Sequence, residues 1–274
     1  MKQINPVRKF NRKFNPAGVI LKYNPAKERQ SIISNGLDFK DETILAVGAH
    51  PDDLDFGFGA TIAKAASQGA KIYYLLATKG QRGSNDKNMT SDELSVLRAN
   101  EQRRAAKVLG VKQVYFLNYN DGELVADIKL KEQIVIYIRK IKPSMVFTMD
   151  PSHFFYKEFG FVNHSDHRAI GEATLDACYP LARDWLSFPE HDALGLKPHK
   201  VKQLFFPSFD PEEANYFVDV TKTLKLKFRA LKFHASQVGD MTAVRQRMTE
   251  RARLLGRIIN KTYAEAFIRL VLWQ

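Results

Sequence analysis

The sequence lacks features that would crosslink the chain or place it in a membrane. It has one cysteine, Cys178, in 274 residues, so no disulfide can form within the chain. No run of about 18 apolar residues is present, as a membrane-spanning helix would need. The first residues also lack the apolar stretch of a secretory signal. We therefore expect a cytoplasmic protein with no membrane partner.

Cys178 lies in an apolar run, where a small buried side chain is the expected role. A metal site in this chain would consequently use His and carboxylate ligands. The composition, 45% hydrophobic and 26% charged, is ordinary for a globular protein with a sizeable core.

Positive charge is concentrated near the N-terminus. The net charge is +12, and residues 1–40 alone hold nine Lys or Arg against two acidic residues. Three Asn-Pro pairs in this stretch favour turns or extended backbone over helix. We predict an irregular basic arm over residues 1–40. Such an arm can bind nucleic acid or an anionic surface, but no aromatic and basic nucleic-acid motif follows it, which disfavours a nucleic-acid partner.

Residues 41–274 are predicted to form one α/β domain. Short β-rich runs alternate with helical periods, which is typical of βαβ units. The expected fold is Rossmann-like: a doubly wound, mostly parallel sheet with helices on both faces. Thr90 and Glu93 form a capping box at the start of a long helix. The core strands are expected near residues 42–50, 71–78, 114–119 and 145–150, and a C-terminal elaboration of strands and charged helices follows near residues 201–274.

Two loops rich in His and Asp follow predicted strands. The first reads His50-Pro51-Asp52-Asp53, and the second, His164-Ser165-Asp166-His167, opens a helix. Ligands in open α/β sheets bind beyond the carboxyl ends of the strands, where both loops lie. A catalytic zinc takes three His or carboxylate ligands and leaves a position for water. His50, Asp53 and His167 supply such a set, for one Zn²⁺ or another divalent ion.

Two further side chains of these loops have predicted catalytic roles. Asp52 remains free beside the metal and can take a proton from the attacking water. His164 can stabilise the developing oxyanion and protonate the leaving amine. Either loop alone could be a turn or a helix cap. The two together, each at a strand exit, favour a metal site, because buried His and Asp without partners are costly.

These segments resemble the LmbE-like or PIG-L deacetylases, whose signature is His-Pro-Asp-Asp after the first strand and a later His-x-Asp-His. The resemblance covers most of residues 42–274. The further matches are Gly57–Thr61, the Arg98-x-x-Glu101 helix, the Asn118–Leu124 loop, His234–Gln237 and Ala264–Phe267. Several matches in the same order are far more specific than any one of them.

The resemblance implies zinc-dependent N-deacetylation. It assigns the metal to His50, Asp53 and His167, the general base to Asp52 and transition-state assistance to His164. It also implies that Asp166 orients a histidine from behind the metal ligands, and that the chain forms a homo-oligomer.

Arg98 and Asp121 match positions that contact the sugar in some relatives. A surface or ion-paired residue on a charged helix is the alternative role for Arg98. The chain also departs from the family pattern. Many relatives have Glu directly after the first motif, where this chain has Leu54 and then Asp55, a form that resembles the subgroup acting on N-acetylglucosaminyl-malate. Ala60 replaces a family glycine.

We therefore expect a zinc-dependent hydrolase that removes an N-acetyl group from an N-acetylglucosamine-type sugar or its conjugate. Hydrolysis of another small amide or ester at the same zinc site is one alternative. A non-catalytic anion or nucleic-acid binder is another, based on the basic arm. A dinucleotide-binding site is disfavoured, because the glycine pattern after the first strand has Ile62 where a third glycine is required.

Overall fold

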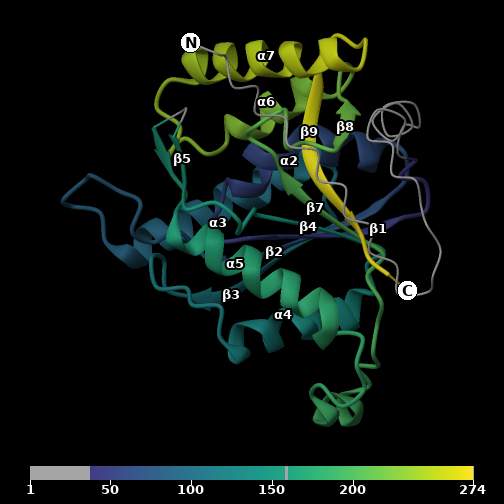
Figure 1. The fold of residues 1–274 in the computed structure, drawn as a ribbon. Coiled ribbons are helices and arrows are strands. Elements are labelled where there is room, and N and C mark those ends of the chain that lie inside the picture. The colour runs from purple at the N-terminus through teal and green to yellow at the C-terminus, as the bar shows by residue number, and fades with distance from the viewer. Residues whose placement is uncertain (1–37, 158–159, 274) are drawn as a thin grey trace, which may run out of the picture. The chain divides into compact units, whose positions relative to one another are not determined.

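A computed structural model describes residues 38–157 and 160–273 of the chain. The basic arm predicted for residues 1–40 lies almost wholly outside these residues. Figure 1 shows the described part. Its strands are β1 (Thr43–Gly48), β2 (Lys71–Thr78), β3 (Gln113–Tyr119), β4 (Met145–Thr148), β5 (Phe155–Tyr156), β6 (Phe161–Val162), β7 (Gln203–Pro207), β8 (Tyr216–Asp219) and β9 (Ala264–Val271). Its α-helices are α2 (Asp53–Ser67), α3 (Ser91–Leu109), α4 (Ile128–Ile141), α5 (Ser165–Asp176), α6 (Leu224–Leu231) and α7 (Met241–Ile258).

Seven of the strands form the central sheet, in the order β3-β2-β1-β4-β7-β9-β8. The five strands from β3 to β7 are parallel to one another. The last two pairings, β7 with β9 and β9 with β8, are antiparallel. This confirms the predicted doubly wound, mostly parallel α/β fold, and it shows that the C-terminal elaboration extends the same sheet.

Strand β1 marks the place where ligands are expected. The chain runs outward from β1 to β2 and β3, then returns to β4 on the other side of β1. The strand order therefore reverses between β1 and β4, and a crevice opens there at the carboxyl ends of the strands. Four consecutive residues of β1, Ile44–Val47, are fully buried, because helices cover both faces of the sheet.

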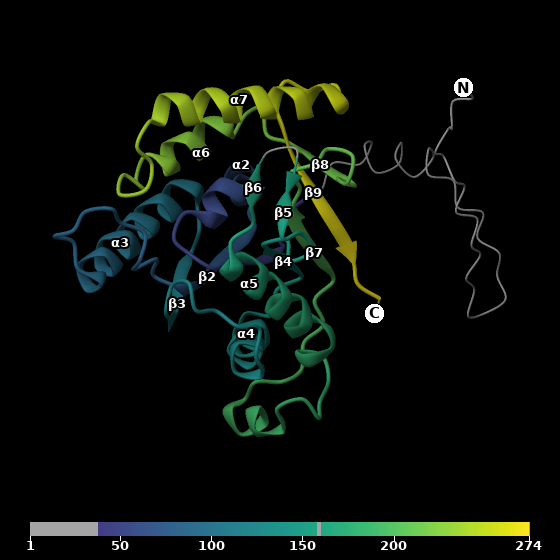
Figure 2. The same ribbon diagram turned by 60° about the vertical axis from the view of Figure 1, so that its left-hand side comes forward.

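The helices divide between the two faces. Helices α2, α3 and α6 pack against one another, and α4 packs against α5. Figure 2 shows the sheet between these two groups, with α7 crossing above α2 and α6. Among the described residues, no helix combines the length and the apolar character needed to cross a bilayer.

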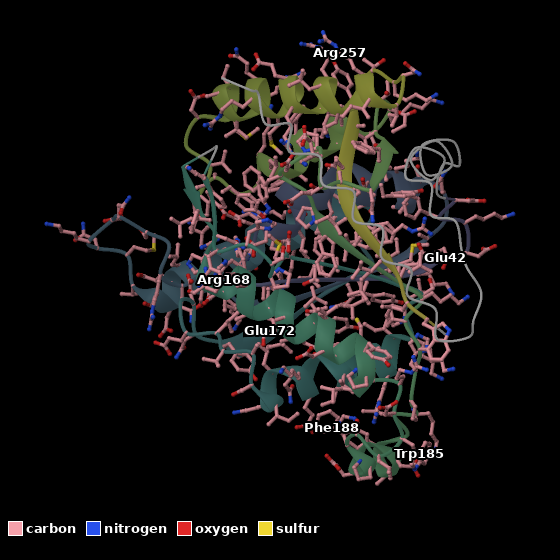
Figure 3. The ribbon with its side chains drawn as sticks, viewed as in Figure 1. Glu42, Arg168, Glu172, Trp185, Phe188 and Arg257 are labelled. Carbon is pink, nitrogen blue, oxygen red and sulfur yellow. The ribbon has the colours of Figure 1, made fainter. Side chains whose placement is uncertain are left out.

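Local sequence explains where the two helices next to the crevice begin. The capping box predicted at α3 is confirmed, since the Thr90 side chain accepts from the Glu93 N–H and the Glu93 carboxylate accepts in return. Helix α5 begins after His164, whose side chain caps it. Ile170 of α5 is buried in the core. Arg168 and Glu172 lie on the opposite, outward side of the helix (Figure 3).

Candidate active site

The turn between β1 and α2 wraps around the carboxylate of Asp53. Asp53 is the first residue of α2, where the helix dipole favours a negative charge. Its Oδ2 accepts hydrogen bonds from the backbone N–H groups of Ala49 (3.1 Å) and His50 (2.8 Å). Its Oδ1 lies 3.0 Å from Nε2 of His167, which α5 brings from across the crevice. Asp53 thus joins the two predicted metal-binding loops.

Three carboxylates fix the orientation of the His50 ring. Nε2 of His50 lies 3.0 Å from Asp166 Oδ2 and 3.1 Å from Asp121 Oδ1, so this nitrogen is the donor. Nδ1 then faces Asp53 Oδ2 at 3.5 Å. Burial lowers the pKa of His50, but the Asp53 charge and the hydrogen bonds from Asp121 and Asp166 outweigh it and raise the pKa to about 12. The pocket around this ring strongly favours a positive charge.

The donor set of His50, Asp53 and His167 fits a zinc ion. One ligand atom from each lies within 4.8 Å of the others. Two imidazole nitrogens and one carboxylate oxygen are a set that catalytic zinc sites use. A second possible grouping joins His50 and His164 with Asp166. Asp166 in this grouping already accepts from His50 and from the N–H groups of Gly122 and Leu124.

Asp166 lies behind His50, a predicted metal ligand. Its Oδ2 accepts from the Gly122 N–H (2.7 Å), and its Oδ1 accepts from the Leu124 N–H (3.2 Å). These bonds and the one from His50 hold the pKa of Asp166 below its usual value, against the effect of burial. A carboxylate that accepts from the far nitrogen of a metal-binding histidine fixes its tautomer. The contacts of Asp166 suit this role, which stays a prediction.

Asp52 has a strained backbone and an unusual carboxyl group. Its φ is 92°, a value that residues other than glycine rarely adopt. Its N–H donates to Gln102 Oε1 at 2.8 Å, which holds this conformation. Burial and the neighbouring Asp53 charge raise the pKa of Asp52 to about 7. Arg98 Nη2 lies 3.6 Å from Asp52 Oδ1.

His164 is the most exposed of the predicted catalytic residues. Its Nδ1 accepts the Asp166 N–H at 3.1 Å, so Nε2 is the nitrogen left for a ligand. The ring centroid lies 4.8 Å from that of His50 and 5.4 Å from that of His167. Burial and the His50 charge lower the pKa of His164. The structure therefore brings His164 to the mouth of the site that the other two histidines form.

Arg98 is a buried residue of the site rather than a surface residue of α3. Its side chain is 5% exposed. It donates to the Pro51 carbonyl (2.8 Å) and the Gly80 carbonyl (2.9 Å), tying together the loops after β1 and β2. Gly80 has a φ of 66°, and a Cβ there would lie 2.3 Å from the guanidinium. Contact of Arg98 with a sugar remains a prediction.

Asp121 lies at the same end of the sheet. Its Oδ1 meets His50, and its Oδ2 accepts the Arg82 N–H at 3.1 Å. Burial raises its pKa, but the bond and charge of His50 outweigh it and lower the pKa to about 2. Asp121 is thus ionised beside His50, and its contact with a sugar also remains a prediction.

A buried polar network beneath Asp52 escaped the sequence analysis as a functional unit. Gln102 donates from Nε2 to Asp55 Oδ2 (2.9 Å), and His234 Nε2 lies 2.7 Å from the same oxygen. The Tyr74 hydroxyl donates to Asp55 Oδ1 (3.1 Å). Each of these side chains is almost fully buried. The sequence pattern that could have predicted this network is the spacing of Arg98, Glu101 and Gln102, which places three polar residues on the inner face of α3.

The matches near the C-terminus attach the last elements to this site. Ser236 donates through its N–H (3.0 Å) and its hydroxyl (2.6 Å) to Glu101. Glu265 accepts from the Thr61 N–H (2.8 Å) and from Lys227 Nζ (2.6 Å). These buried contacts hold α6 and β9 against α2 and α3.

The chain is similar to one family model and to several known proteins. The PIG-L family model, described as GlcNAc-PI de-N-acetylase, matches residues 45–178, which include both predicted metal-binding loops. Diacetylchitobiose deacetylase of Thermococcus kodakarensis is 33% identical over 231 residues, covering 80% of this chain and 81% of that protein. A probable N-acetyl-alpha-D-glucosaminyl L-malate deacetylase 2 of Bacillus subtilis is 28% identical over 210 residues, covering 73% of this chain and 85% of that protein. The solved N,N'-diacetylchitobiose deacetylase from Pyrococcus horikoshii has a TM-score of 0.77 at 28% identity, over 90% of this chain and 91% of that chain.

Proposed function

Because the chain belongs to the PIG-L family of de-N-acetylases, we propose that it is a zinc-dependent deacetylase of N-acetylglucosamine-type sugars or their conjugates. The observation that carries this proposal is the junction at Asp53. Its carboxylate joins the loops of His50 and His167, and Asp52 lies next to it with its own carboxyl group free of the ligand set. The chain has the ligands and a separate base in one crevice.

Zn²⁺ at His50, Asp53 and His167 would supply a Lewis acid that polarises the amide carbonyl and lowers the pKa of water from about 15.7 to about 7. Asp52 takes a proton from the attacking water, a task that suits a carboxyl group with a pKa of about 7. His164 stabilises the oxyanion and donates a proton to the leaving nitrogen. The C–N bond breaks, and the products are acetate and a free amine.

The polar groups beside Asp52 suit a sugar. Arg98 lies beside Asp52 and Asp121 lies beside His50, and we assign both side chains to contacts with sugar hydroxyl groups. Relatives named for diacetylchitobiose and for N-acetylglucosaminyl-malate support this substrate class. We also expect a homo-oligomer in the cytoplasm, with the basic arm as a candidate bridge between subunits.

The test is release of free amine from a panel of N-acetylglucosamine, its disaccharide and its malate and inositol conjugates. Zinc-loaded protein should release amine, and the same protein treated with a chelator should not. Bound zinc with no release across the panel would reject these substrates in favour of another amide or an ester. Absence of both metal and release, with salt-sensitive retention on DNA, would support the anion-binding alternative.

A further inference from the structure

A cavity of about 490 Å³ is lined by two of the three predicted metal ligands, Asp53 and His167. Asp53 and His167 form one end of it. Its wall comes from the start of α2, the end of β7, the start of β9 and one face of α7, including Val244 and Met248. Figure 2 shows α7 lying across these elements. The cavity therefore begins at the metal site and runs beneath the C-terminal elaboration.

Most of the residues that line the cavity are apolar, and apart from the exposed Arg247 its cationic side chains are already bonded. Lys227 Nζ donates to the Phe56 carbonyl (2.7 Å) and to Glu265 (2.6 Å). Arg251 Nη2 donates to the carbonyls of Ser208 (2.7 Å) and Phe209 (2.8 Å). A sugar placed here would lose the hydrogen bonds that its hydroxyl groups make to water. An alkyl chain would lose none.

Aromatic rings stand at the opening of the cavity. Phe161 of β6 and Phe209 have ring centroids 5.8 Å apart, and both are partly exposed, at 40% and 39%. Phe155 on the paired strand β5 is 62% exposed. Exposed aromatic side chains beside an apolar cavity are typical of a ligand site rather than of a sealed packing defect.

The predicted metal ligands in the wall indicate which part of a bound substrate would lie next to the cavity. Among the described residues, the wall includes Asp53 and His167, but Asp52, Arg98 and His164 lie outside it. A substrate with its sugar at the polar groups and its carbonyl carbon at the metal ligands has one remaining substituent, the acyl chain. With the carbonyl carbon at Asp53 and His167, which also line the cavity, the acyl chain is the part of the substrate next to the cavity.

The size of the cavity decides between an acetyl group and a longer chain. The methyl group of an acetyl fills roughly the volume of one water molecule, about 30 Å³. The cavity holds about 490 Å³, within the range of about 300–1,000 Å³ that is typical of pockets for whole ligands. We propose that this cavity binds the acyl chain of the substrate, so that the enzyme hydrolyses N-acyl amino sugars with chains longer than acetyl.

This inference rests on the proposed deacetylase function and changes only the acyl group. Water still adds to the carbonyl carbon and the C–N bond still breaks. The chain leaves as a fatty carboxylate, and the amine keeps the proton that His164 delivers. No reactant other than water is needed.

The first experiment compares kcat/KM for N-acetyl-, N-butanoyl-, N-hexanoyl- and N-octanoylglucosamine on zinc-loaded protein. Each buried methylene should raise kcat/KM about fourfold, so that butanoyl exceeds acetyl roughly 15-fold. Hydrolysis of the acetyl substrate with no gain for longer chains would overturn the inference and leave the proposed function intact. Failure to cleave any member of the series would reject the proposed function itself.

A substitution in the cavity wall tests whether filling the cavity, rather than general damage to the fold, changes the preference for chain length. Met248→Trp places a larger side chain in the cavity and should lower the hexanoyl-to-acetyl ratio of kcat/KM at least tenfold. Leu254→Trp is the matched control, because Leu254 lies on the same helix but is 60% exposed and outside the wall. An unchanged ratio in Met248→Trp, or an equal fall in Leu254→Trp, would contradict the assignment.

Binding of the product gives a readout that does not depend on turnover. Octanoate should bind the zinc-loaded protein more tightly than acetate, with a negative heat-capacity change in calorimetry. Met248→Trp should remove this difference, and Leu254→Trp should keep it. Equal affinities for octanoate and acetate in the unaltered protein would overturn the inference.

Discussion

The active site has a polar wall around Asp52 and an apolar wall beneath α7, and the two differ in how they are built. The polar wall comes from the ends of the parallel strands and from α3, and its side chains are fixed by hydrogen bonds to backbone carbonyl and N–H groups. The apolar wall comes mainly from α7 and β9, in the antiparallel extension of the sheet.

The difference corresponds to the part of the chain that the family model covers. Residues 45–178 include every predicted metal ligand, whereas α7 and β9 lie beyond them. In the proposed reaction, the covered part supplies the groups that break the bond, and the C-terminal part supplies the cavity beside them. Changes in the first part should therefore affect chemistry for all substrates, and changes in the second should affect the choice among substrates.

The largest effect is expected from His167→Ala. Removing one of three ligands should lower zinc content well below one ion per chain and reduce turnover of every substrate to the chelated background. Metal analysis and amine release measure both. His199→Ala is a suitable control, because His199 donates to the Pro143 carbonyl away from the ligand set. Full zinc occupancy in His167→Ala would remove His167 from the ligands.

Asp52→Asn should separate metal binding from catalysis on the polar wall. The amide cannot accept the proton of the attacking water, so kcat should fall by roughly 10²–10⁴-fold. Zinc content should stay near that of the unaltered protein, because Asp52 is outside the ligand set. The fall should be similar for acetyl and hexanoyl substrates. Loss of zinc, or retained turnover, would contradict the division of roles between Asp52 and Asp53.

Gln102→Leu should have a smaller effect, because Gln102 acts through Asp52. The substitution removes the acceptor of the Asp52 N–H and leaves Asp55 short of a donor. We expect kcat to fall roughly tenfold with KM little changed, and unfolding stability to fall by about 1–3 kcal/mol.

Tyr74→Phe is the matched control for that change. It removes a donor to the other oxygen of Asp55 and leaves the Asp52 contact in place. Its stability should fall while kcat stays near the original value. Equal kcat in Gln102→Leu and Tyr74→Phe would show that the network only stabilises the fold.

Sequence alone gave a better account of the polar wall than of the apolar one, for a physical reason. His50, Asp53 and His167 follow predicted strands, and the fold class places the ends of neighbouring parallel strands at one edge. Asp55, Gln102 and His234 meet only because α2, α3 and α6 pack together, which no local spacing encodes. The cavity depends in addition on where α7 crosses the sheet, and this is set by packing between segments about 200 residues apart along the chain.

The smallest predicted effect compares one helix cap from each wall. Asp240 accepts from the N–H groups of Thr242 and Ala243 at the start of α7, and Thr90 caps α3. Replacing either with Ala should cost about 1 kcal/mol, or about 2–4 °C in Tm. Because α7 forms the wall of the cavity, Asp240→Ala should lower hexanoyl turnover more than acetyl turnover. Thr90→Ala should leave the ratio of the two unchanged, since α3 carries Arg98 and Gln102 but no part of the cavity. Melting curves and paired kcat/KM values measure both effects, and a shift of the ratio in Thr90→Ala alone would reverse the assignment of the two walls.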